Sequence, residues 1–210
     1  MTPGVKFARV AEEGEVVAPS RSTSELRTDA RRNAAQILAA ARNVFGEHGF
    51  SAPLEDVAVA AGVSKATIFN RFGGRVGLIE AVIEDVVAAE SQRIIEHTRS
   101  IPDVAERIDH YLGAIRDLQY RRPAVNDVLL QEYPHSEQLL AICHAAGEIY
   151  DELVEAGHAA GVLAPEFTRE DLHALIVDNA LALKHGSRPP RADYDRRTGF
   201  ILGGIRRPAR

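Results

Sequence analysis

Apolar residues recur at steps of three and four along most of this chain, which is the spacing of helices with one buried face. The first such pattern covers 28–48, and shorter ones cover 53–61 and 64–72. Glycines at 49, 62, 73 and 74 separate these segments. No stretch alternates apolar and polar residues at every second position, so we predict an all-α protein without strands.

Further helices are predicted beyond Gly74. They cover 75–99, 103–122 with Pro123 as its end, a short segment at 126–133, a long helix capped by Ser136, 171–185 and 192–205. Thr168 and Asp171 have the spacing of a capping box, in which each side chain bonds the backbone of the other. The sequence therefore predicts three short N-terminal helices followed by a larger helical region.

The segment from Leu54 to Phe72 has the pattern of a helix-turn-helix. Its apolar residues can pack the two helices together, with Gly62 and Val63 in the turn and Ile68 facing inward. The second helix then presents its polar side chains outward. A helix with such a face fits the major groove of B-DNA. These residues alone do not exclude an ordinary helical hairpin within a bundle.

Residues 31–89 resemble the TetR family of transcriptional regulators, both in this motif and in the preceding ILAAARNVFGEHGF. Two positions depart from the family pattern. Phe69 replaces a tyrosine and cannot donate to phosphate, so that role passes to Lys65, Thr67 and Arg71. Arg75 replaces a lysine and can still bind phosphate. The DNA-binding residues implied by the resemblance are Ser64, Lys65, Ala66, Thr67, Phe69, Asn70, Arg71 and Arg75.

The resemblance also implies a homodimer that binds double-stranded operator DNA and a small-molecule effector. The helices at 171–185 and 192–205 would form the dimer surface. Ligand binding would change the spacing of the two recognition helices, which makes a repressor released by its ligand the expected function. An activator and a ligand-independent regulator remain alternatives.

We expect four regions along the chain. These are a disordered tail at 1–24, the helix-turn-helix DNA-binding domain at 25–75, a helical ligand-binding and dimerisation domain at 76–206, and a tail at 207–210. Six residues place a polar atom on or beside an apolar helical face, as pocket walls do. They are Tyr111, Tyr120, Cys143, His144, Tyr150 and Asn179. For each, a buried core residue with satisfied hydrogen bonds is the competing interpretation, and Cys143 is expected to be buried.

Charge is distributed unevenly along the chain. Residues 21–75 carry eight basic and five acidic side chains, a net of +3, whereas 76–210 carry fifteen basic and twenty-two acidic ones, a net of −7. A positive module on a negative remainder suits a protein with one end facing phosphates. The sequence pI of about 5.9 argues against a nucleoid protein that binds DNA without preference.

The remaining composition favours a cytoplasmic protein. Cys143 is the single cysteine, and no uncharged apolar run is long enough to span a bilayer or to form a secretory signal. The histidines lack metal-ligand spacing, and no nucleophile stands beside a base. We therefore expect no metal, no cofactor, no membrane partner and no catalytic site, with a helical enzyme as the weaker alternative.

Overall fold

The computed structural model describes residues 23–130 and 137–206, and most of them are helical. The helices are α1 (Thr23–His48), α2 (Leu54–Ala61), α3 (Lys65–Phe72), α4 (Arg75–Val82), η1 (Ile83–Ala88), α5 (Ala89–Ser100), α6 (Val104–Arg121), α7 (Pro123–Leu129), α8 (Glu137–Ala159), α9 (Arg169–His185) and α10 (Arg191–Gly204). Within those ranges no strand occurs, and one isolated bridge joins Leu163 to Arg206. The predicted all-α class is confirmed.

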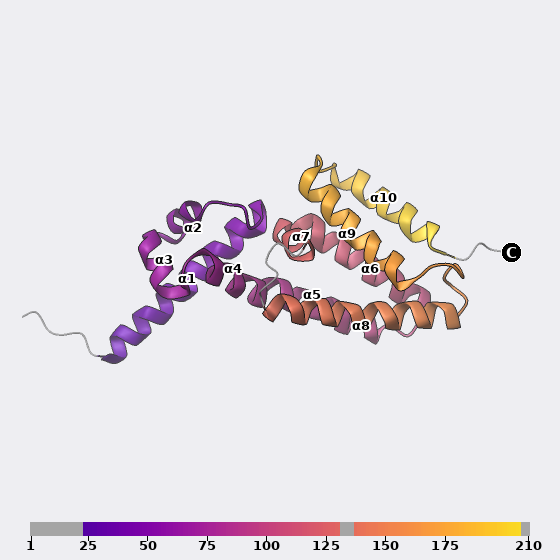
Figure 1. Cartoon of the computed structure of the whole chain (residues 1–210), viewed down its shortest axis with the longest axis horizontal. Helices are drawn as coiled ribbons and strands as arrows, with labels where there is room; N and C mark the ends of the chain where they lie inside the picture. The colour runs from indigo at the N-terminus through magenta and orange to yellow at the C-terminus, as the bar shows by residue number, and fades with distance from the viewer. Residues whose placement is uncertain (1–22, 131–136, 207–210) are drawn as a thin grey trace, which may run out of the picture.

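The molecule is elongated, with α1–α3 at one end and α5–α10 at the other (Figure 1). We call these the head and the body. α4 and η1 connect them and continue into α5, so one helical rod runs from the head into the body. In the described part of the chain, no helix is both long and apolar enough to cross a membrane.

The head forms where the sequence predicts it, with local signals setting the helix ends. Gly49 and Gly73 have φ values of 75° and 71°, a left-handed conformation that glycine adopts without a Cβ clash. Ser64 caps α3 as expected. The start of α1 is different, because Thr23 and Ser24 are already helical instead of belonging to a tail.

The predicted fourth helix is divided by a π-helical segment, η1. A π turn bonds each N–H to the carbonyl five residues back, so it holds one residue more than an α turn. This inserted residue was not predicted, because an apolar pattern at steps of three and four continues across it.

Pro123 opens a helix instead of only ending one. α6 stops at Arg121, and Pro123 occupies the first turn of α7. Proline suits this place because the N–H it lacks would have no partner in a first turn. The predicted short segment at 126–133 is thus shifted, since α7 covers Pro123–Leu129.

The last helices follow the capping signals. Asp103 accepts the N–H of Glu106 at 2.8 Å at the start of α6. Thr168 and Asp171 form the predicted capping box of α9. The predicted tails, apart from residues 23 and 24, and the Ser136 cap lie outside the described residues.

Two apolar clusters hold the fold together. The first joins the head to α4 and η1 and also includes Leu118, Val125 and Val128 from the body. The second lies within the body, around Leu112 and Ile176. Because the first cluster reaches α7, the head packs directly on the body.

Candidate nucleic-acid interface and body cavity

The turn between α2 and α3 is fixed by its backbone. Gly62 has φ 63°, and the N–H of Val63 donates to the carbonyl of Ala58 at 3.0 Å. Ser64 then accepts the N–H of Thr67 at 3.1 Å. These bonds set the direction in which α3 leaves the turn.

α3 has one buried side and one open side. Ile68 is fully buried within the first apolar cluster, and Thr67 is half-buried. The exposed side chains of this segment are Ser64, Lys65, Ala66, Phe69, Asn70 and Arg71. Seven of the eight residues predicted to bind DNA therefore lie on or beside one open face, and Arg75 follows in α4.

Lys65 forms an ion pair with Glu55 of α2. The hydrogen bond from Lys65 lowers the pKa of Glu55. Both side chains are more than half exposed, so water screens the pair and its contribution to stability is small. Lys65 can thus exchange this carboxylate for a phosphate at little cost.

Arg75 lies partly inside the head. Its guanidinium donates to the carbonyl of Phe50 and lies 5.7 Å from the centre of the Phe45 ring. Phe69, another residue predicted to bind DNA, is 64% exposed. Arg75 thus connects α4 to the end of α1, and in this conformation part of its donor capacity is used within the fold.

Gly77 sets the approach of α4 to α3. A Cβ at this position would lie 1.9 Å from the carbonyl oxygen of Phe72, much closer than real contacts allow. The absence of a side chain lets the start of α4 pack directly on the last turn of α3. This contact fixes α3 relative to the rod that enters the body.

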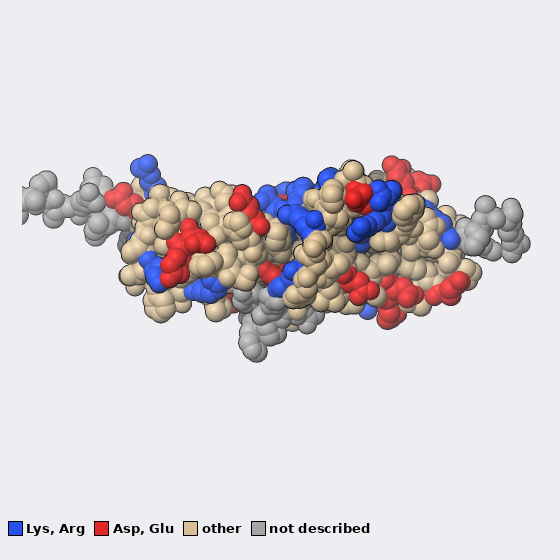
Figure 2. All heavy atoms as spheres, turned by 90° about the horizontal axis from the view of Figure 1, so that it is seen from above, with Lys and Arg blue, Asp and Glu red and all other residues tan. Residues whose placement is uncertain are grey.

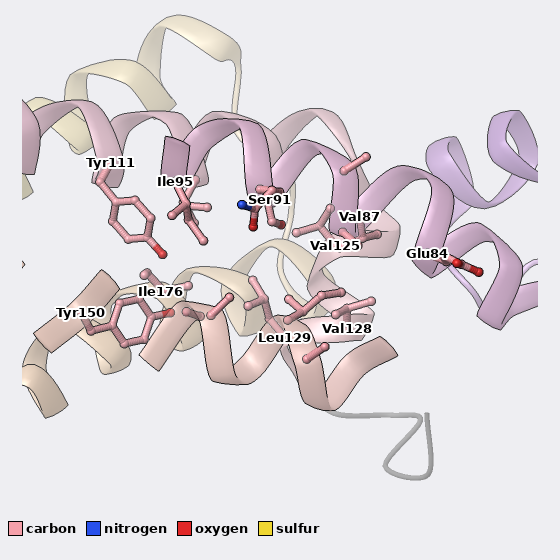
Figure 3. Close-up of a pocket in the computed structure, with 18 residues that line it drawn as sticks. Glu84, Val87, Ser91, Ile95, Tyr111, Val125, Val128, Leu129, Tyr150 and Ile176 are labelled. Carbon is pink, nitrogen blue, oxygen red and sulfur yellow. The ribbon is translucent and has the colours of Figure 1, made fainter. Parts of the chain in front are cut away.

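A cavity of about 370 Å³ lies in the body between η1, α5, α6, α7, α8 and α9. Its walls are mainly aliphatic. Figure 3 shows Tyr111 of α6 and Tyr150 of α8 directing their hydroxyls into the space near Ile95 and Ile176, with Glu84 of η1 at the opposite end. A cavity of this size suits a small-molecule ligand.

Tyr111 and Tyr150 stay protonated. Burial raises the pKa of Tyr111 well above its usual range and the pKa of Tyr150 to about 12. This end of the cavity therefore offers uncharged phenols as hydrogen-bonding groups.

α7 lies between the cavity and the head. Its Val125 and Val128 line the cavity, whereas Asp127 reaches the head. The Asp127 carboxylate accepts the backbone N–H of Phe50 and binds Nζ of Lys184 in α9 at 2.6 Å. One buried carboxylate thus ties the α1–α2 loop to the body.

Comparison with known proteins identifies the head. Residues 37–82 match the sequence profile of bacterial regulatory proteins of the tetR family. The head is that of the TetR family. The chain is also 46% identical over 56 residues to the HTH-type transcriptional regulatory protein RaaS of Mycobacterium tuberculosis, and this match spans 27% of the chain and 26% of that protein.

The fold of most of the chain is also that of solved TetR-family structures. A TetR transcriptional regulator from Streptomyces coelicolor has a TM-score of 0.56 at 25% identity and covers 83% of this chain and 99% of its own. A TetR-family regulator from Agrobacterium tumefaciens has a TM-score of 0.64 at 20% identity, covering 85% and 100%. FadR of Bacillus subtilis, solved with stearoyl-CoA, has a TM-score of 0.59 at 15% identity, covering 82% and 97%.

Among the six residues predicted for the ligand site, Tyr111 and Tyr150 line the main cavity. Cys143 lines a smaller cavity of about 160 Å³ that shares Tyr150 with the first. The prediction that Cys143 is buried is wrong, because its thiol is exposed where α8 opens onto the smaller cavity. His144 is 78% exposed and pairs with Glu148, so it does not reach either cavity.

Tyr120 and Asn179 stabilise the packing of the body. The hydroxyl of Tyr120 donates to the carbonyl of Pro189 at 3.0 Å. The amide of Asn179 donates to Gln119 at 2.7 Å and to the hydroxyl of Tyr194 at 2.9 Å. Both side chains therefore fit the competing interpretation, in which they belong to the core and have their hydrogen bonds satisfied within the fold.

The sequence pattern predicted neither Asp127 nor most of the cavity wall as functional. Asp127 had a signal, because it is a lone acid within the apolar run AVNDVLL. The aliphatic wall residues had none, since a valine beside a cavity and a valine in a packed core have the same sequence pattern.

On the side of the molecule seen in Figure 2, the charge asymmetry of the sequence does not produce a single basic face. The head carries separate Lys and Arg side chains there, with acidic ones between them. More basic side chains gather over the middle of this side, between the head and α10. On this side, DNA contact would have to depend on individual side chains more than on a broad positive surface.

Proposed function

We propose that this chain is a homodimeric transcriptional repressor that binds a palindromic operator through α3 and is released when a small molecule occupies the body cavity. The proposal depends above all on the open polar face of α3, held outward by buried Ile68 and by the Ser64 cap. It is supported by the TetR-family head and by the fold of most of the chain.

On this proposal, α3 lies in the major groove with its first turn nearest the base edges. Lys65 and Arg71 bind phosphate or guanine, and Thr67 contacts a phosphate or a thymine methyl group. Asn70 is exposed beside them and has the amide that recognises adenine. Arg75 positions α3 through its bond to Phe50 and also reaches phosphate.

The dimer surface we propose is formed by α9 and α10. Leu181 and Phe200 are 42% and 71% exposed in the single chain, which is unusual for large apolar side chains in a folded body. A Cβ at Gly199 or Gly203 would have open space around it, so a second copy of α10 can approach closely. Two heads about one DNA turn apart, roughly 34–36 Å, would then meet successive major grooves.

The coupling route we propose runs through α7. A ligand that displaces Val125 or Val128 moves the helix that carries Asp127, and Asp127 binds the N–H of Phe50 in the head. The head then shifts in each half of the dimer. Losing a few base contacts, each contributing about 1–3 kcal/mol, releases the operator.

The test begins by selecting a binding site from a randomised DNA library and measuring its affinity by fluorescence anisotropy with excess competitor DNA. The double variant Lys65→Ala with Thr67→Ala removes two contacts and should weaken binding by at least about 30-fold. Arg99→Ala removes an exposed charge from the body, where Arg99 pairs with Glu152 at 2.6 Å, and should leave affinity unchanged.

Wild-type affinity in the double variant would refute the placement of α3 in the groove. Equal affinity for every sequence would favour a non-specific DNA-binding protein. Transcription measured in vitro from a promoter overlapping the selected site separates the alternatives, since a repressor lowers the transcript level and an activator raises it.

A further inference from the structure

The walls of the body cavity carry almost no charge. Of the described residues that line it, none is lysine, arginine or histidine, and Glu84 is the one carboxylate. Glu84 is exposed to water and lies at the end away from the tyrosines. An anionic ligand group would lose its hydration here without gaining a counter-charge, which is unfavourable in an apolar site.

The smaller cavity beside Tyr150 is lined by Arg169 and His173, so these basic groups lie outside the main cavity. The guanidinium of Arg169 is paired with Asp151 at 2.8 Å. An anion bound there would have to compete with that carboxylate. FadR of Bacillus subtilis was solved with stearoyl-CoA, which carries several phosphates, and the described wall residues of this cavity include no cation to match them.

The tyrosine end supplies a hydrogen-bond donor. Tyr111 and Tyr150 are 1% and 4% exposed, and their rings meet edge to face with centres 6.0 Å apart. Both hydroxyls lie at the same end of the cavity, so a phenolic O–H can donate to a ligand there. The neighbours Ile95 and Ile176 provide no polar atom except those of the backbone, so an acceptor on the ligand is the natural partner.

We propose that this cavity binds an uncharged, mainly apolar molecule that has one hydrogen-bonding oxygen between Tyr111 and Tyr150. The chain extends from this oxygen along the aliphatic walls toward Ser91 and Glu84. This assignment rests on the proposed function, because it names the chemical class of the effector.

Four probes with the same acyl or alkyl length test the assignment: decan-1-ol, decanoate, decylamine and decanoyl-CoA. Binding to the full chain is measured by thermal shift and by titration calorimetry near pH 7.5. Decan-1-ol should raise the melting temperature and bind at least about ten times more tightly than each charged probe. Tighter binding of decanoate, decylamine or decanoyl-CoA, or no binding of any probe, would overturn the assignment.

Two pairs of variants locate the binding site. Tyr150→Phe removes the donor but keeps the ring, so decan-1-ol should bind about 3- to 10-fold more weakly. Tyr120→Phe makes the same change outside the cavity and should not alter binding. Ala145→Leu fills space in the cavity and should abolish binding, whereas Ala159→Leu, at an exposed position of the same helix, should not.

Failure of the assignment and failure of the proposed function can be distinguished. Specific operator binding with no response of the cavity to decan-1-ol refutes the ligand class alone. Binding of decan-1-ol that is lost in Ala145→Leu, together with an unchanged operator affinity, supports the ligand class and refutes release by effector.

Discussion

The head and the body place their polar groups in opposite ways. In the head, α3 buries Ile68 and presents Lys65, Asn70 and Arg71 to solvent. In the body, α6 and α8 bury the hydroxyls of Tyr111 and Tyr150 at the end of a mainly aliphatic cavity. The head therefore has a surface suited to a charged polymer, and the body has an interior suited to an apolar molecule.

This contrast explains why the head and the body resemble known proteins in different ways. The TetR-family profile covers 37–82, whereas the similarity of the body is one of fold. A recognition helix needs a turn, a cap and outward polar residues at set positions. An apolar cavity can be enclosed by many combinations of aliphatic side chains.

The largest effect is expected from Gly77→Ala. A Cβ at Gly77 would overlap the carbonyl of Phe72, so unfolding should become easier by about 2–3 kcal/mol and operator binding should fall sharply. Gly113→Ala is the matched control in α6, where a Cβ has open space and helix propensity improves by about 0.5–1 kcal/mol. Denaturant unfolding of both variants, with opposite signs expected, tests whether this contact defines the head.

Asp127→Asn should have the next largest effect, because it removes the charge that Lys184 binds. We expect a loss of about 2 kcal/mol in unfolding free energy and a weaker effect of ligand on operator affinity. Asp117→Asn, in the more exposed cluster with Arg121 and Arg191, should cost less than about 1 kcal/mol. Undiminished ligand response in Asp127→Asn would show that head and body communicate by another route.

These two sites differ in how far the sequence could predict them. The helix-turn-helix was predictable because Ser64, Gly62 and buried Ile68 act locally, within a few residues of the structure they determine. Asp127 forms its contacts with Phe50 and Lys184, which are 77 and 57 positions away, and no local pattern identifies such partners.

Neither the cavity nor the π turn could be predicted from the sequence. Tyr111 and Tyr150 could be singled out as polar groups on apolar faces, but so could Tyr120 and Asn179, which have structural partners. Only the packing of the helices decides which hydroxyl donates to a carbonyl and which one faces the cavity.

A smaller effect is expected at the start of α3. Ser64→Ala removes the cap and should destabilise the head by about 1 kcal/mol. Ser64→Asp keeps the cap but adds a negative charge where we place phosphate, so stability should be retained while operator affinity falls. If Ser64→Asp lowered the unfolding free energy and the operator affinity together, this would argue against placing phosphate at the start of α3.

The smallest effect is a pH dependence of the unfolding free energy, and it arises in the body alone. Burial, followed by the proximity of His97, lowers the pKa of His110, although Glu106 acts in the opposite direction. The folded state then binds fewer protons than the unfolded state as pH falls below about 6.5. Unfolding free energy should therefore decrease slightly on acidification through this range, and His110→Phe should reduce that decrease while operator binding by the head is retained.

The π turn at Ile83–Ala88 sets the rotational phase between the two ends of the rod. Each residue of an α-helix advances about 100° around the axis. Because the π turn accommodates one residue without that advance, converting η1 to regular α-helix at constant length would turn α3 by about that angle about the rod axis. Each subunit could then keep an intact head and an intact cavity, and yet the pair would face DNA with recognition helices out of alignment.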